Sequence, residues 1–243
     1  MIICRFFRPG KKAKFPVAAA VLRLSTKYEA PSHRRRAIDL LSTAYPLTLS
    51  AWDNRSKTRL VPAFEGEIRS ILSLAIENDV RVLLPGIFRA ASKVSLPAML
   101  NELHSLQLNE GTRQDIVTKF VVGREALKAA EIRHILQFLG PSFQRPNCRD
   151  SNRCMNILAT LHRASIVKIM DPVESYQRGY DDNPASVGST FNLCDQCATL
   201  VKESVRRGRE QIWETLPEMF GLPGWDALVA ESDNGEGPAE EDD

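Results

Sequence analysis

The sequence predicts an all-α fold, an irregular bundle or array of helices. Through most of the 243 residues, apolar side chains recur every three or four positions, which is the period of one face of an α-helix. The alternation of apolar and polar residues that marks a half-buried strand is almost absent. Proline and glycine recur between the apolar stripes and divide the chain into segments of helical length.

The apolar stripes and their capping residues set the expected elements. Ser32 and Ser95 are suitable N-cap residues, and Thr112 with Asp115 three positions later matches a capping box. The expected helices cover residues 17–28, 32–45, 64–76, 79–88, 95–106, 112–139, 154–167 and 195–216, with a possible break near Gly123. The expected connectors are residues 47–62, which contain Trp52, and residues 142–153 and 179–190.

Charge is distributed very unevenly along the chain. Residues 1–36 carry ten Lys and Arg against one acidic residue, whereas residues 231–243 carry seven acidic residues and no basic one. We expect residues 1–16 to form a disordered basic leader and residues 231–243 a disordered acidic tail. Basic segments of this kind attract nucleic acid or anionic membranes in some proteins. We favour the simpler interpretation of a solvated leader on a neutral body.

Composition also bears on the cellular compartment. No apolar run approaches the roughly 18 residues required to cross a bilayer. The basic N-terminal stretch lacks the apolar core and cleavage site of a secretory signal. Five cysteines, an odd number, argue against a fully paired disulfide scaffold. We therefore expect a cytoplasmic or nuclear protein without membrane contact.

Four of the five cysteines form two close pairs, which predict a metal site. Cys148 and Cys154 have five residues between them, and Cys194 and Cys197 have two. Two such pairs can deliver four thiolates to one tetrahedral zinc ion, and four thiolates leave no open position for catalysis, so the predicted zinc is structural. His162 is a candidate substitute for one ligand. Two alternatives stay open: four unconnected thiols, or a disulfide or redox role.

The sequence shows no motif typical of an active site. The histidines at positions 33, 104, 134 and 162 are scattered and match no Ser/His/Asp or Cys/His arrangement. The glycines form neither a GxGxxG nor a GxxxxGK[ST] phosphate loop. We expect no catalytic residues, no cofactor-binding residues and no enzymatic activity.

A stretch near the C-terminal side, IWETLPEMFGLPGWDAL at residues 212–228, is rich in large apolar residues. It either docks on a partner as a peptide or folds back onto the helices of its own chain. We favour folding back.

Several short runs resemble one protein family. They are residues 22–29 (LRLSTKYE), 34–37 (RRRA), 41–46 (LSTAYP), 52–53 (WD), 79–85, 123–125 (GRE) and 208–225, together with the paired cysteines. In combination they resemble the large fungal group of BTB/POZ-domain proteins over about residues 17–230. The resemblance implies that residues 17–46 are a remnant of the C-terminal helices of a BTB domain and that residues 47–230 are a BACK-like helical region. We expect the strands and the dimerisation helix of the family to be missing, so the resemblance implies either a truncated BTB domain or a misassigned start of the chain.

The same resemblance implies a function. Members of this family bind other proteins as dimers or adaptors, so we expect a non-enzymatic interaction module with a protein partner of unknown identity. The cysteine pairs add the expectation of a structural zinc ion. The alternative is a zinc-containing nucleic-acid-binding regulator, which the basic head and the arginines of residues 145–153 indicate. We do not expect nucleic acid to be the partner, and the oligomeric state stays open.

Overall fold

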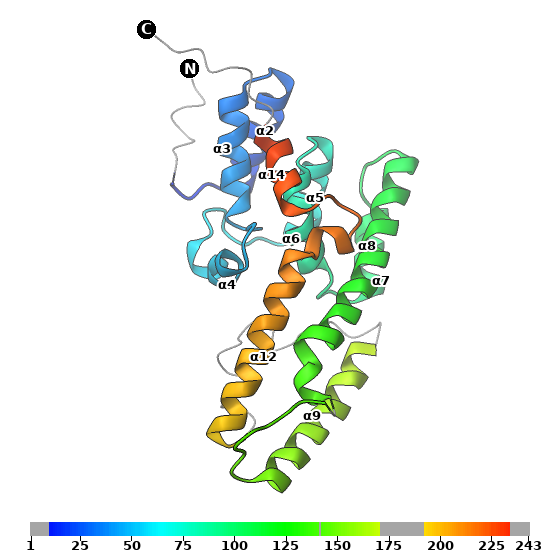
Figure 1. The fold of residues 1–243 in the computed structure, drawn as a ribbon. Helices are drawn as coiled ribbons and strands as arrows, with labels where there is room; N and C mark the ends of the chain where they lie inside the picture. Colours follow the sequence, from blue (N-terminus) through cyan, green and yellow to red (C-terminus); the bar gives the residue numbers. More distant parts are fainter. Residues whose placement is uncertain (1–9, 141, 171–191, 234–243) are drawn as a thin grey trace. The chain divides into compact units, whose positions relative to one another are not determined.

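The computed structural model describes residues 10–140, 142–170 and 192–233, and every regular element within these ranges is a helix (Figure 1). The all-α prediction is therefore confirmed. The elements are α2 (Phe15–Lys27), α3 (Pro31–Ser42), α4 (Leu49–Thr58), α5 (Glu67–Glu77), the 3₁₀ turn η1 (Arg81–Leu83), α6 (Leu84–Ala91), α7 (Leu96–His104), α8 (Glu110–Ala130), the π turn η2 (Glu131–Ile135), the 3₁₀ turn η3 (Leu136–Leu139), α9 (Ser151–Met170), α12 (Asp195–Glu214), α13 (Leu216–Met219) and α14 (Trp225–Asp233). Among the described helices, none is long and apolar enough to cross a lipid bilayer.

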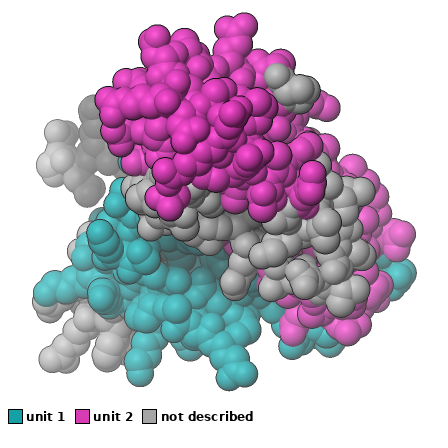
Figure 2. Space-filling view, turned by 90° about the horizontal axis from the view of Figure 1, so that it is seen from below, with its two compact units in different colours: residues 1–91, 105–110, 222–243 teal, residues 92–104, 111–221 magenta. Residues whose placement is uncertain are grey.

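The chain divides into two compact units, which Figure 2 colours separately. Unit 1 contains residues 1–91, 105–110 and 222–243, and unit 2 contains residues 92–104 and 111–221. The family resemblance implied a boundary between residues 46 and 47. The compact units divide the chain elsewhere, because α2 and α3 share unit 1 with α4, α5 and α6.

Unit 1 is built on the pairing of α2 with α3. Ala37 and Leu41 of α3 are fully buried, as the apolar stripe of this helix predicted. On α2 the stripe predicted from Val17, Ala20, Val21 and Leu24 is wrong in part, because Leu24 is 41% exposed and Leu22 is the fully buried leucine. Burial of each leucine side chain contributes about 2 kcal/mol to folding.

Helix α2 begins at Phe15, two residues inside the expected disordered leader. Pro16 suits the first turn of a helix because the missing N–H has no intrahelical acceptor there. The ring of Phe15 also stacks on the ring of Phe64, with 4.8 Å between their centroids. The leader prediction is therefore wrong for Phe15 and Pro16, and residues 1–9 lie outside the described part of the chain.

Residues 47–62, expected to be a connector, contain helix α4. The hydroxyl of Thr48 accepts a hydrogen bond from the N–H of Ala51 and caps this helix. Trp52 is the buried side chain of α4, and the guanidinium group of Arg55 lies 3.6 Å from the centre of its ring. One tryptophan makes no apolar stripe, so helical periodicity could not reveal this helix. Burying the large indole side chain nevertheless stabilises it.

Two close helix contacts organise unit 2. α12 packs along η2 and η3, and a Cβ atom at Gly208 would lie 2.3 Å from the carbonyl oxygen of His134. A Cβ atom at Gly123 of α8 would lie 2.0 Å from the ring of Phe220. α8 runs through Gly123 without the expected break, because the glycine is needed for this contact rather than for a turn.

The apolar stretch of residues 212–228 folds back onto the chain, as we favoured. Trp213, Phe220 and Leu228 are buried, and the ring of Phe220 lies against Gly123 within unit 2. The following helix α14 packs against η1 in unit 1 and extends to Asp233. The expected disordered acidic tail is thus helical over residues 231–233, and residues 234–243 lie outside the described residues.

Candidate metal centre

The first cysteine pair lies where a loop enters α9. Asn147 adopts a left-handed conformation with φ of 60°, which turns the chain just before Cys148. The carboxylate of Asp150 accepts a hydrogen bond from the N–H of Arg153 at 3.0 Å and caps the helix. Cys154 therefore lies in the first turn of α9, and its side chain is fully buried.

The second pair opens α12. Cys194 is the N-cap residue of this helix, with extended backbone angles of −65° and 156°, and its carbonyl accepts the N–H of Ala198 at 2.9 Å. Cys197 lies in the first turn and is fully buried. Both cysteine pairs are thus placed at helix N-termini, where the helix dipole and free N–H groups stabilise negative charge.

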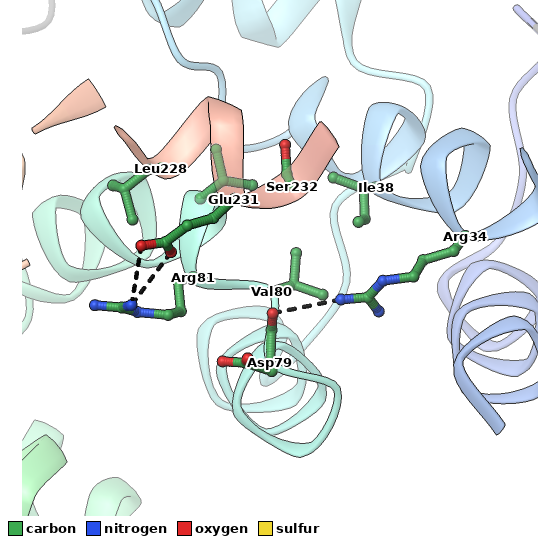
Figure 3. A pocket seen from close by; sticks show the side chains of 9 residues that line it. Arg34, Ile38, Asp79, Val80, Arg81, Leu228, Glu231 and Ser232 are labelled. Atoms are coloured by element: carbon green, nitrogen blue, oxygen red, sulfur yellow. Dashed lines mark hydrogen bonds and ion pairs between the residues drawn. The ribbon is translucent and has the colours of Figure 1, made fainter. Parts of the chain in front are cut away.

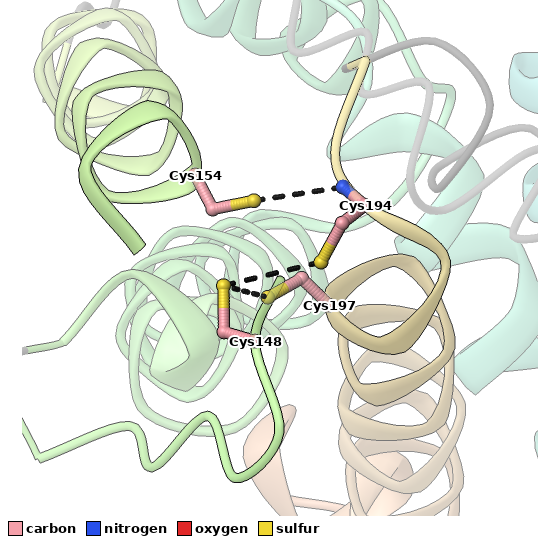
Figure 4. A group of neighbouring side chains, drawn as sticks. All are labelled: Cys148, Cys154, Cys194 and Cys197. Carbon is pink, nitrogen blue, oxygen red and sulfur yellow. Dashed lines mark hydrogen bonds between the residues drawn. The ribbon is translucent and has the colours of Figure 1, made fainter. Parts of the chain in front are cut away.

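The four sulfur atoms lie together, all within 4.8 Å of one another (Figure 4). The Sγ atom of Cys148 lies 3.4 Å from that of Cys197 and 3.9 Å from that of Cys194. The N–H of Cys194 donates a hydrogen bond to the Sγ of Cys154 at 3.5 Å. Four thiolates bound to one metal at 2.3 Å in a tetrahedron are about 3.8 Å apart. The sulfur positions therefore match the size of a four-thiolate metal site.

The surroundings of the thiols differ. Backbone N–H groups of Cys197 and Arg149 donate hydrogen bonds to Cys194 and lower the pKa of its thiol to about 6, so it is a thiolate at neutral pH. Burial raises the pKa of Cys154 and of Cys197. Without a cation, these two buried thiols stay protonated at neutral pH. A bound metal ion would supply the positive charge that favours their thiolate forms.

The donor set indicates the kind of metal that fits. Thiolates are soft ligands that bind zinc, copper(I) or iron, whereas magnesium and calcium require oxygen ligands. Cys148 and Cys194 are half-buried, so one edge of the cluster lies near the surface, while Cys154 and Cys197 close the other side. All four cysteines are free thiols. The cluster is compatible with a metal site that uses all four side chains.

The structure brings together the four predicted cysteines and leaves out the candidate substitute. His162 is exposed on α9 and is not part of the cluster. Cys4, the fifth cysteine, lies outside the described residues.

Two features near the cluster were not predicted from the sequence. One is the N–H of Arg149, a backbone donor that no side-chain pattern reveals. The other is an exposed ion pair between Arg149 and Asp195 at 3.5 Å, which links the loop before α9 to the first turn of α12. Exposed pairs of this kind contribute at most about 1 kcal/mol. Asp150 three residues before Arg153 is a recognisable N-cap signal that would have placed the start of α9 correctly.

Comparison with protein-family models, with curated proteins and with solved structures finds no match. The BTB resemblance therefore stays a prediction from short sequence runs. What is known of the site comes from the geometry of the chain itself.

Proposed function

We propose that this chain is a non-enzymatic protein-interaction module whose unit 2 is held in shape by a structural zinc ion. The observation that carries the zinc proposal is the approach of four cysteine Sγ atoms to within 4.8 Å at two helix N-termini. Zinc is the metal of choice because it prefers tetrahedral thiolate sites and brings no redox chemistry.

The proposed role of the zinc ion is to attach α9. Among the side chains described on α9, over residues 151–163, those of Cys154 and Leu158 are the buried ones. Over these described residues, two buried side chains give limited stability by themselves. A zinc ion bound by Cys154 and by the cysteines of α12 ties the two helix starts together. Structural zinc sites contribute roughly 10 kcal/mol or more of binding free energy to the folded state.

A binding role fits this architecture better than catalysis. If all four thiolates bind the zinc ion, no coordination position remains for a substrate or an activated water. Val122 and Met155 of unit 2 are large apolar side chains that stay about half exposed, at 60% and 49%. Exposed apolar side chains are common at protein contacts, although scattered ones are also ordinary. Together with the family resemblance, they support an interaction module with a protein partner.

The zinc proposal is tested by native mass spectrometry of the full chain purified from zinc-supplemented medium. The expected result is one zinc per chain, lost on chelation, together with a lower melting temperature. Cys154→Ser and Cys197→Ser are expected to abolish stoichiometric binding. Cys4→Ser, at the cysteine outside the cluster, is the matched control and is expected to bind zinc normally. A metal-free chain with the same helicity and melting temperature as the zinc-treated chain would refute the proposal.

A second candidate function is nucleic-acid binding, favoured by the arginines around the cluster. Arg149, Arg153 and Arg163 are exposed on the loop before α9 and on its first turns. Binding through phosphates weakens steeply with salt. A labelled DNA or RNA duplex whose affinity falls with salt and with the change of these arginines to glutamine would support this alternative. An affinity that does not respond to either change would exclude it.

A further inference from the structure

Unit 1 contains a pocket of about 370 Å³ between α3, η1 and α14 (Figure 3). The two arginines that line it already have partners in the chain. Arg81 pairs with Glu231 at 3.2 Å, and the guanidinium group of Arg34 donates to the carbonyl oxygen of Asn78 at 2.9 Å. The thiol groups of the described residues lie elsewhere, in the four-cysteine cluster of unit 2, and thiols are open to oxidation.

The four cysteines differ in their access to solvent. Cys154 and Cys197 are fully buried, whereas Cys148 and Cys194 are half-buried. The rate at which a thiolate is oxidised depends on its exposure. An oxidant dissolved in water therefore meets the sulfur of Cys148 or Cys194 first.

The two accessible sulfurs need only a small movement to bond. The Sγ atoms of Cys148 and Cys194 are 3.9 Å apart (Figure 4), and those of a disulfide are about 2 Å apart. Cys148 lies in the loop before α9, and Cys194 is the N-cap residue of α12, so neither lies inside a helix. Cys197 is nearer to Cys148, at 3.4 Å, but it is held within the first turn of α12. Bonding of Cys148 to Cys194 therefore disturbs the helices least.

The residues that follow these two cysteines are also linked. Arg149 comes directly after Cys148 and Asp195 directly after Cys194, and their side chains form an ion pair at 3.5 Å. The pair is exposed, so its contribution to stability is small. Its position nevertheless favours an arrangement in which the two segments lie side by side without help from a metal ion.

We propose that Cys148 and Cys194 form a disulfide when hydrogen peroxide reaches the cluster, and that this bond releases the zinc ion. One zinc-bound thiolate attacks a peroxide oxygen, so the O–O bond breaks, hydroxide leaves and a sulfenic acid forms on that sulfur. The second thiolate attacks the same sulfur, so the S–S bond forms and the S–O bond breaks to release a second hydroxide. The peroxide gains the two electrons that the two sulfurs lose, and both hydroxides take up protons from the solvent to become water.

The disulfide removes two of the four proposed ligands, because its sulfur atoms no longer carry negative charge. Cys154 and Cys197 are then the remaining thiolates, whereas a structural zinc site is four-coordinate. The ion leaves, and these two sulfurs take up one proton each. The switch rests on the zinc site proposed above, and it makes the attachment of α9 through Cys154 sensitive to oxidants.

The test treats the zinc-loaded full chain with hydrogen peroxide and measures its zinc content by native mass spectrometry. The remaining thiols are blocked with N-ethylmaleimide, and the chain is digested with a protease that cleaves before aspartate. Cleavage before Asp150 and Asp195 places the four cysteines of the cluster in separate peptides. The expected result is loss of the zinc ion together with a linked pair of the Cys148 and Cys194 peptides, while Cys154 and Cys197 are blocked. A dithiol reductant followed by zinc should restore the bound ion.

The zinc content before treatment separates two kinds of failure. A chain that holds no zinc before peroxide is added refutes the zinc site, and the switch with it. A chain that holds zinc and keeps it in peroxide overturns the switch alone, as does loss of zinc with Cys154 or Cys197 in the disulfide. Loss of zinc without a disulfide, or with a bond between two chains, overturns it too.

Two variants sharpen the test. Cys148→His keeps a group that binds zinc but cannot form a disulfide, so this variant should retain zinc in peroxide. Release of zinc from it as fast as from the unchanged chain contradicts the proposal, and if it fails to bind zinc, the peptide map of the unchanged chain decides. Cys4→Ser, at the cysteine outside the cluster, is the matched control. It should release zinc and form the same disulfide as the unchanged chain, and a failure to do so contradicts the pairing of Cys148 with Cys194.

Discussion

The Sγ atoms of Cys148 and Cys197 lie 3.4 Å apart although 49 positions separate the two residues in sequence. One sits in the loop before α9 and the other in the first turn of α12. Any ion that binds both therefore connects the loop that enters α9 to the start of α12.

Removing zinc is expected to release α9 first. If free zinc exceeds the Kd a thousandfold, binding contributes about 4 kcal/mol, which corresponds to roughly a thousandfold slower opening. Hydrogen exchange measured by mass spectrometry should show this loss of protection over residues 151–163 after chelation. The amides of α2 and α3 in unit 1 serve as the internal control and should not change. Equal exchange in α9 with and without the chelator contradicts the prediction.

The metal-free chain is expected to show one unusually reactive thiol. A thiolate is the reactive form, and the pKa of Cys194 is lowered to about 6 by backbone hydrogen bonds. Its alkylation by iodoacetamide should therefore stay near its maximum from pH 8 down to pH 7 and fall only below about pH 6. Burial raises the pKa of Cys154 and Cys197, so these should react slowly over the whole range. Peptide mass spectrometry after timed labelling measures each site, and a Cys194 rate that falls about tenfold from pH 8 to pH 7 would count against the assigned hydrogen bonds.

The two glycines of unit 2 are expected to respond differently to alanine. Gly208→Ala places a Cβ 2.3 Å from the backbone oxygen of His134, so the backbones must separate. We expect a loss of about 2 kcal/mol or more in the free energy of unfolding. This exceeds the gain of about 1 kcal/mol that alanine brings to a helix interior.

Gly123→Ala meets the side chain of Phe220 rather than backbone. Phe220→Leu should restore part of the stability that Gly123→Ala loses, because leucine lacks the ring edge that the new Cβ would meet. No side-chain change at His134 should rescue Gly208→Ala. Chemical denaturation of the single and double variants distinguishes the two cases, and rescue of both or of neither contradicts the contacts described.

The buried arginine of α8 is expected to be a source of instability. Arg124 is 1% exposed, and its three guanidinium nitrogens have no hydrogen-bond acceptor among the described residues. Burial lowers its pKa, and the nearest carboxylate oxygen, on Glu125, is 3.6 Å away. The long pair with the exposed Glu125 compensates this burial only in part. Replacing a buried ion pair by apolar side chains of similar volume is often stabilising, by about 1–4 kcal/mol. Arg124→Met should therefore raise the denaturation midpoint, whereas the control Arg133→Met, at an exposed position, should not. A fall in the midpoint shows that Arg124 has an acceptor in solution.

The sequence was sufficient for the helical stripes with several apolar residues per turn. Leu41, Ile71 and Phe120 all belong to such stripes, and all three are fully buried on the helices that the spacing predicted. The sequence was insufficient to predict a helix, or the start of a helix, that depends on a single contact. α4 depends on the burial of Trp52, and the start of α2 depends on the stacking of Phe15 on Phe64, a residue far along the chain. Neither contact leaves a periodic pattern.

The four-cysteine cluster was predictable in its members but not in its details. The spacing of Cys194 and Cys197 and the types of the four side chains selected the members. The different acidity of the thiols was not predictable, since it depends on backbone N–H groups such as that of Arg149. The positions of these N–H groups depend on how the loop before α9 approaches α12 in the folded chain.

The close approach of α12 to η2 at Gly208 also affects the position of the cysteine cluster. Eleven positions of α12 separate Gly208 from Cys197, a distance of about 16 Å along the helix axis. Since an α-helix moves as a nearly rigid rod, pushing α12 off the His134 backbone also displaces its cysteines from Cys148. The zinc content of the purified chain should therefore depend on how closely α12 approaches η2. A substitution at residue 208 should lower the zinc content of the chain before it lowers its helix content.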